Sequence, residues 1–300
     1  MTELTFNREY EFRYCTAQEI APGLRRVVAR NPSAFTFYGT GTYIVGHKSV
    51  AVIDPGPASQ EHIDAVLEAV ADCTVSHILV THTHLDHSPA SRAVAAATSA
   101  PCFAFGPHGS GNGGDEIQVE EGADWEFEPD VRVAHGDVVE NEEWSFECVY
   151  TPGHTSNHMC FAWRETNSLF CGDHVMGWNS TIVSPPDGNM TDYIASLDLL
   201  LEREDTLYYP THGSPIDNPH EYVRALRAHR LARAEQILAG LAVGTATAWQ
   251  LAERLYTHLP REMLGAASRA VLATLIYLQA QDRVQADHQD LDTARWHSLE

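Results

Sequence analysis

The sequence predicts a layered α/β fold that is followed by a helical module. Runs of β-branched and aromatic residues alternate with amphipathic helical stretches over the first 220 residues, which is typical of sheets covered by helices. Single histidines and aspartates stand directly after several of these runs, where loops carry functional side chains. Beyond Pro219 the pattern becomes helical. We therefore expect a main domain over residues 1–220 and a second domain over residues 221–300.

The first half of the chain is predicted to alternate between strands and helices. In residues 59–71 the apolar positions recur at intervals of three and four, and residues 90–100 are rich in alanine, so both stretches are predicted helices. The segment Asp54 to Pro57 is predicted to be a turn. Strands are expected at residues 23–30, 34–45, 50–53, 75–80 and 102–105.

Residues 106–130 interrupt this alternation with a glycine-rich stretch and then an acidic one. A surface loop is the expected structure, and a lid over a functional site is the alternative. After it, a helix is predicted at residues 191–202. Further strands are predicted at residues 144–150, 158–163, 169–171 and 206–209.

The stretch from Thr81 to Ser88 is the strongest functional signal. It reads Thr-His-Thr-His-Leu-Asp-His-Ser and follows the apolar run at residues 78–80. Side chains at positions i and i+2 of a strand end point to the same side, so His82 and His84 can bind one ion together. Asp86 and His87 follow at the corner, where they suit a second ion. Imidazole and carboxylate groups are typical ligands of zinc and similar divalent metals.

Two metals need more ligands, and three candidates stand just after predicted strands, each beside a glycine. They are His154, Asp173 and His212. Glycine allows the backbone to approach a crowded centre closely.

Several neighbours of these candidates have weaker signals. His158 and His174 adjoin candidate ligands and are candidates for supporting them, with a purely structural role as the alternative. Trp178 and Asn179 are candidates for lining a pocket, whereas Cys171 is expected to pack within its strand instead of acting as a nucleophile.

Composition limits the class of protein. The chain has 300 residues and a net charge of −22, and all of that excess lies in residues 1–220. Such an acidic surface repels polyanions and argues against a strong nucleic-acid binder, although bound cations would still permit cleavage of nucleic acid. We expect a cytoplasmic protein without a membrane span, because the N-terminus resembles no secretory signal and no apolar run reaches 18 residues.

Residues 221–300 are predicted to form three helices and a short hairpin, similar to a small winged helix. The second helix is expected to begin with a capping box at residues 247–250. Four arginines on the first helix suggest nucleic-acid binding, but steps of three residues spread them around the helix, so we favour a solvated face. They are Arg224, Arg227, Arg230 and Arg233.

The complete set of candidate ligands resembles the metallo-β-lactamase superfamily, whose fold is an αββα sandwich. Its HxHxDH motif is matched by the residues of the first stretch, and its later His, bridging Asp and final His are matched as well. The resemblance implies one zinc on three histidines and a second zinc on three further residues, with Asp173 bridging. The first set is His82, His84 and His154, and the second is Asp86, His87 and His212.

Within that superfamily the chain is most similar to the LACTB2-like subgroup, whose best known members are endoribonucleases acting on single-stranded RNA. The resemblance rests on residues 31–46, on residues 153–159 and on the C-terminal module. It implies a dinuclear zinc hydrolase that uses a metal-bridging hydroxide as nucleophile, with iron or manganese as alternative metals. Asp86 is the candidate catalytic residue, because it could orient the nucleophile or carry its proton.

Three functions remain open. The first is cleavage of single-stranded RNA or of a small ester. The second is a thioesterase or lactonase of the glyoxalase II type, which the acidic surface fits better than a polymer substrate. The third is a mononuclear iron dioxygenase. The C-terminal module would contact substrate or another subunit, and in the latter role it would form a homodimer.

Overall fold

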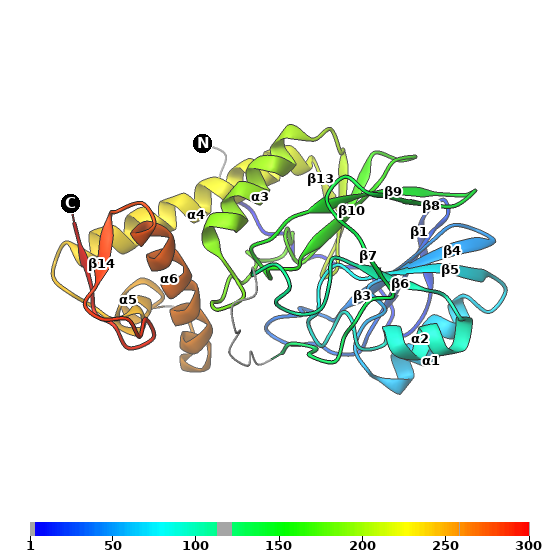
Figure 1. Cartoon of the computed structure of the whole chain (residues 1–300), viewed down its shortest axis with the longest axis horizontal. Coiled ribbons are helices and arrows are strands. Elements are labelled where there is room, and N and C mark those ends of the chain that lie inside the picture. The colour runs from blue at the N-terminus through cyan, green and yellow to red at the C-terminus, as the bar shows by residue number, and fades with distance from the viewer. Residues whose placement is uncertain (1–3, 113–121, 258, 300) are drawn as a thin grey trace.

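The computed structural model describes residues 4–112, 122–257 and 259–299 (Figure 1). These residues form a four-layered α/β body and a smaller C-terminal module. Within them, none of the helices combines the length and the apolar composition needed to cross a bilayer.

The first sheet is built from the N-terminal half and has seven strands in chain order. Its strands pair antiparallel from β1 to β4 and parallel from β4 to β7. The strands are β1 (Gln18–Ala21), β2 (Leu24–Val28), β3 (Gly41–Val45), β4 (Ser49–Ile53), β5 (Thr74–Leu79), β6 (Cys102–Ala104) and β7 (Val131–Arg132).

The second sheet has six strands in the order β13-β12-β11-β10-β9-β8. Only the β11–β12 pair is parallel, because helix α3 connects these two strands on the outer face. The strands are β8 (Val138–Glu140), β9 (Ser145–Tyr150), β10 (Met159–Trp163), β11 (Ser168–Gly172), β12 (Leu207–Pro210) and β13 (Ile216–Asp217).

The two sheets pack face to face, and helices cover both outer faces. Side chains such as Tyr43 from the first sheet and Phe146 and Phe170 from the second share one core between the sheets. Helices α1 (Gln60–Ala69) and α2 (Ser91–Thr98) cover the first sheet, and α3 (Met190–Glu202) and α4 (Pro219–Leu241) cover the second. The chain therefore folds as the αββα sandwich that its motifs implied.

The predicted strand at residues 34–45 is wrong in its first half, because β3 begins only at Gly41. Residues 31–40 form a loop that is held by polar side chains. The amide group of Asn31 bonds the backbone N–H and the hydroxyl of Thr40, and Ser33 Oγ accepts from the N–H of Thr36. Phe37 takes a left-handed backbone conformation with φ of 57°. Such local bonds compete with a strand ladder, and the loop they create borders the functional site.

The C-terminal module contains α4, α5 (Ala248–Leu255), α6 (Leu264–Gln279) and the hairpin of β14 (Val284–Ala286) and β15 (Trp296–Ser298). The predicted capping box is present, with Thr247 and Gln250 bonding each other's backbone. Helix α4 takes part in two cores. Val223 and Leu226 pack against the second sheet, whereas Ile237 packs inside the module.

The arginines of α4 do not form a solvated face throughout. Arg230 is buried, donates to the carbonyl of Thr181 and lies over the ring of Tyr193. Arg227 forms an ion pair with Asp198 of α3. These two guanidinium groups attach the helix to the α/β body, so they are engaged within the protein and not free to bind a nucleic acid. A pattern of charge along a helix could not reveal this, because the partners come from distant segments.

Candidate metal centre

The seven predicted ligands lie together at one edge of the sandwich, in loops that follow strands. The motif after β5 supplies four of them, and the loops after β9, β11 and β12 supply one each. Their ligand atoms form three overlapping clusters of three, within each of which the atoms lie no more than 4.8 Å apart. We describe these residues as two groups, according to the two ions that they could hold. The residues are His82, His84, Asp86, His87, His154, Asp173 and His212.

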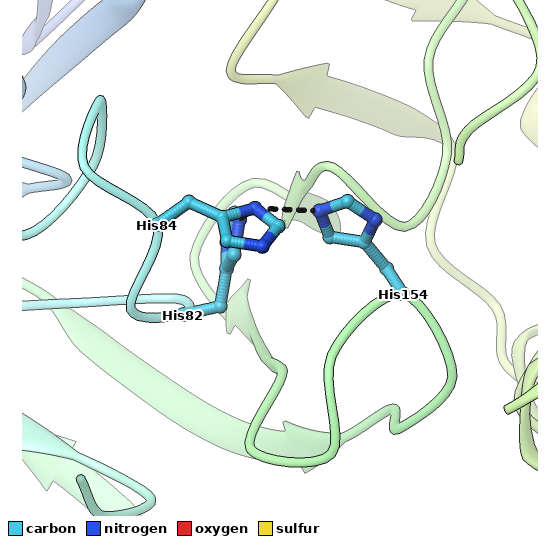
Figure 2. Close-up of side chains that lie close together, drawn as sticks. All are labelled: His82, His84 and His154. Carbon is cyan, nitrogen blue, oxygen red and sulfur yellow. Dashed lines mark hydrogen bonds between the residues drawn. The ribbon is translucent and has the colours of Figure 1, made fainter. Parts of the chain in front are cut away.

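Three imidazole rings converge in the first group (Figure 2). The Nδ1 atom of His84 lies 3.0 Å from Nε2 of His82 and 3.1 Å from Nε2 of His154. One ring nitrogen offers either one proton or one lone pair, so Nδ1 of His84 cannot form a good hydrogen bond to both neighbours at once. A divalent cation would accept all three lone pairs, which is the ligand chemistry of zinc.

Two histidines and two carboxylates form the second group. The Oδ2 atom of Asp86 lies 3.3 Å from Nε2 of His87 and 3.2 Å from Nε2 of His212. Asp173 stands between the groups, with Oδ2 3.6 Å from His87 Nε2 and 3.8 Å from His154 Nε2. The buried atoms His87 Nε2 and Asp173 Oδ1 have no hydrogen-bond partner among the described residues. Such orphaned groups fit a bound cation.

The charges of the two groups differ. Burial lowers the pKa of His84 to about 3 and holds the pKa of His82 well below its usual value, so these imidazoles are neutral and can ligate. In the second group burial also lowers the pKa of His212, but the carboxylates of Asp173 and Asp86 outweigh it and raise this pKa to about 10. The protonated ring balances the carboxylates in the metal-free protein. A divalent cation would supply that positive charge in its place.

Asp54 supports the centre from behind and was not predicted, because the sequence showed it only as part of a turn. It follows β4 and is buried. Its Oδ2 atom lies 3.0 Å from Nδ1 of His87, and its two oxygens also accept bonds from Thr81 and from the hydroxyl of Thr211. The carboxylate thus fixes the ring of His87 with Nε2 toward the centre. The available signal was the same as for the ligands: an aspartate directly after an apolar strand.

Backbone carbonyls orient two more ligands. Nδ1 of His154 lies 2.6 Å from the carbonyl oxygen of Ile182, and Nδ1 of His212 lies 3.2 Å from that of Gly39. A carbonyl only accepts, so each ring holds a proton on Nδ1, and Nε2 is the nitrogen that faces the centre and would ligate a cation. The hydroxyl of Thr40 donates to Asp86 Oδ2 at 3.0 Å.

The other predicted neighbours divide into supporting and remote residues. His158 supports the site, since its Nε2 accepts from the backbone N–H of Asp173 at 3.3 Å. His174 packs against Tyr193 instead. Trp178 stacks on Phe37 and does not line the pocket. Cys171 is fully buried in β11, and burial raises the pKa of its thiol, so it packs as expected.

Gly153 allows the loop before His154 to pass close to α3. Its φ is 136°, and a Cβ atom there would lie 2.4 Å from Cα of Tyr193. We expect Gly153→Ala to displace His154, lower metal affinity and cost roughly 1–3 kcal/mol of stability. Denaturant unfolding and metal titration of the variant would test this. Gly136→Ala is a control for the left-handed backbone alone, because no atom lies within 4 Å of its added Cβ. Equal effects of the two substitutions would refute the proposed clash.

A cavity of about 600 Å³ opens onto the centre. Asp86, His154 and Asp173 line it, together with apolar side chains that include Phe35 and Ile182. The segment at residues 106–130, for which a surface loop was expected and a lid was the alternative, falls partly on residues 113–121, which lie outside the described residues. The following segment packs on the metal loop, where Leu85 donates its N–H to the carbonyl of Gly122.

This fold and site define a class of metal-dependent enzymes. Residues 36–212 match the Metallo-beta-lactamase superfamily, and residues 247–296 match the Beta-lactamase associated winged helix domain. The chain therefore belongs to the metallo-beta-lactamase superfamily, and the predicted winged-helix character of its C-terminal module is confirmed.

Several curated relatives are thioesterases by name. The atrochrysone carboxyl ACP thioesterase of Aspergillus chevalieri is 26% identical over 297 residues, covering 93% of this chain and 88% of that protein. Thioesterase pkgB of Emericella nidulans is 30% identical over 232 residues, which are 75% of this chain but only 62% of that protein. The chain thus spans less than two thirds of the length of pkgB.

Solved structures show the same fold. A metallo-beta-lactamase family protein from Thermus thermophilus superposes with a TM-score of 0.75 at 24% identity, over 93% of this chain and all of that one. Family and relatives together support a hydrolytic enzyme, as expected. They support the thioesterase hypothesis better than the RNA hypothesis, and they do not confirm the LACTB2-like subgroup.

Proposed function

We propose that this chain is a metal-dependent thioesterase that hydrolyses an acyl thioester carried by a small thiol or by a carrier protein. The observation that carries the proposal is the set of seven ligands gathered in two groups beneath an apolar cavity. The thioesterase names of two relatives support this reaction over the alternatives.

The ligand set fits two zinc ions. His82, His84 and His154 would hold one ion, and the second group would hold the other. Asp173 lies close enough to both groups to bridge them. Two bound cations would lower the pKa of a shared water and polarise the thioester carbonyl.

The chain's own residues would position the reacting groups. Asp86 is held by the hydroxyl of Thr40 and faces the cavity, so it can orient the attacking water or carry its proton. The walls are largely apolar and include Phe35, Leu85 and Met176. Such walls favour an apolar acyl chain and exclude bulk water from the reacting carbonyl.

The acyl chain offers a graded test. We expect kcat/KM for neutral acyl thioesters of N-acetylcysteamine to rise with each added methylene, by up to about fourfold per group that the cavity buries. Release of free thiol by zinc-loaded protein measures this. Leu85 is 51% exposed at the cavity, so Leu85→Ser should flatten the series, whereas Val243→Ser, at an exposed residue of the C-terminal module, should not. A chain-length series that stays flat in the wild type would contradict apolar recognition.

Cleavage of single-stranded RNA has weaker support. The net charge is −22, and Arg227 and Arg230 of α4 are engaged within the protein. Zinc-loaded protein should therefore cleave a thioester and leave a labelled single-stranded RNA intact. The proposal would be wrong if the protein cleaved RNA but no thioester, and if this RNA cleavage were lost in Asp173→Ala. A ribonuclease function would then take its place.

A further inference from the structure

The C-terminal module contributes to the wall of the active-site cavity. Two residues of α6, Ala266 and Arg269, line the cavity together with the candidate ligands. Arg269 is the sole lysine or arginine among the lining residues that the structure describes. The module therefore places a permanent positive charge where a substrate would enter.

The guanidinium of Arg269 is held in place from two sides. It donates to Ser184 Oγ at 3.4 Å and to the carbonyl of Pro185, both in the catalytic body, and forms an ion pair with Asp292 of its own module. Its side chain is still 35% exposed, and that of Asp292 is 61% exposed. A guanidinium has five N–H groups, so donors remain for a ligand even while these contacts persist.

The electrostatic setting gives this arginine a function. Residues 1–220 carry the whole excess of negative charge, and such a body repels an anionic substrate unless a fixed cation faces it. An oxyanion is the group that a preorganised guanidinium binds best. Apart from the candidate metal ligands, the cavity is lined largely by apolar and small polar side chains, so among the described lining residues no second guanidinium or ammonium group competes with Arg269 for that anion.

We propose that Arg269 binds an oxyanion of the thioester substrate, and that the winged-helix module thereby sets substrate specificity. This inference rests on the proposed thioesterase function. The oxyanion belongs either to a carboxylate on the acyl group or to a phosphate on the thiol. Arg269 is a specificity-determining residue and takes no part in the chemical step.

Three thioesters separate these sources. Hexanoyl-N-acetylcysteamine is neutral, adipoyl-N-acetylcysteamine carries a carboxylate on the acyl side, and hexanoyl-coenzyme A carries phosphates on the thiol side. In Arg269→Gln we expect KM for one anionic substrate to rise about tenfold or more. The kcat for that substrate, and both KM and kcat for the neutral substrate, should change less than about threefold. Arg269→Lys should recover part of the loss. A rise for adipoyl thioester identifies the acyl side, and a rise for the coenzyme A ester identifies the thiol side.

Matched variants separate specificity from a structural role. Arg283 forms a similar ion pair within the module, with Glu235, but it does not line the cavity. Arg283→Gln should therefore leave KM and kcat for all three substrates unchanged. Asp292→Asn removes the carboxylate that competes with a substrate anion for Arg269, so anion binding should become tighter. The gain should be only a few-fold, because exposed ion pairs are weak. An equal fall in kcat/KM for all three substrates in Arg269→Gln would overturn the inference.

Equilibrium binding decides the inference independently of turnover. Adipate and coenzyme A are titrated calorimetrically into zinc-loaded wild type, Arg269→Gln and Arg283→Gln. We expect one anion to bind about tenfold more weakly to Arg269→Gln alone. Equal binding to all three proteins, or no binding to the wild type, would overturn the inference. Failure of the wild type to cleave any thioester would instead refute the proposed function. The titration would still show whether Arg269 binds an anion.

Discussion

Replacing Asp173 with alanine is expected to abolish thioester hydrolysis, with kcat/KM falling on the order of 10³-fold or more, or at least about 4 kcal/mol of transition-state stabilisation. Asp173 Oδ2 lies within 3.8 Å of nitrogen atoms from both ligand groups, those of His154 and His87. Its loss removes a carboxylate that lies close enough to both groups to join two ions. We also expect metal content to fall from two ions per chain toward one. Steady-state kinetics and elemental analysis of the same sample measure both effects.

Asp205→Ala is the matched control for Asp173→Ala. Asp205 is also a buried aspartate, paired with Arg203 at the start of β12 and remote from the ligands. This variant should lose stability but keep its metal and its activity per folded molecule. If Asp173→Ala retained two ions and full turnover, the bridging role would be wrong.

The second large effect is expected at Asp54. Its carboxylate accepts bonds from the backbone and hydroxyl of Thr81 and from Thr211, and it fixes the ring of His87. Asp54→Ala leaves these buried donors without an acceptor, which costs about 1–3 kcal/mol for each one that finds no other partner. We expect roughly 3 kcal/mol or more of lost stability and about 10- to 100-fold weaker metal binding. Chemical denaturation and competitive metal titration measure the two losses.

Asp54→Asn distinguishes the two roles of that carboxylate. The amide keeps the shape and one acceptor oxygen, so part of the stability should return. It carries no charge and cannot accept on both sides, so His87 should still bind metal weakly. Wild-type metal affinity in both variants would show that Asp54 does not orient His87.

The metal ligands could be predicted because their signal is local. Four of them lie within six residues after an apolar strand, and His154, Asp173 and His212 repeat the pattern of strand, polar ligand and glycine. Strands that end at one edge of a sheet bring such residues together without further information. The structure accordingly gathers all seven, although their binding of metal stays a prediction.

Features that depend on distant partners could not be predicted. Arg230 is buried because Thr181 and Tyr193, far away in the chain, provide its contacts. Arg269 enters the cavity only because α6 packs against the catalytic body. Residues 34–40 have aromatic side chains with high strand propensity, which is why the sequence predicts a strand there. The bonds of Asn31 and Ser33 instead hold these residues in a loop.

The substrate was the least accessible property. Bound metal ions can activate water for attack on either a phosphodiester or a thioester, so the candidate ligands favour hydrolysis without selecting between these substrates. The choice depends on the cavity wall, where Phe35, Ile182 and Arg269 come from three separate regions of the chain. The names of the relatives favour a thioester over RNA.

The most direct test of the central claim is thioester hydrolysis during zinc titration of metal-free protein. We predict no activity without metal, a rise as zinc binds and a plateau at two ions per chain, as the two ligand groups require. Binding is followed by calorimetry in parallel with thiol release. Full activity in verified metal-free protein, or no thioester cleavage by protein that holds two ions, would contradict the account.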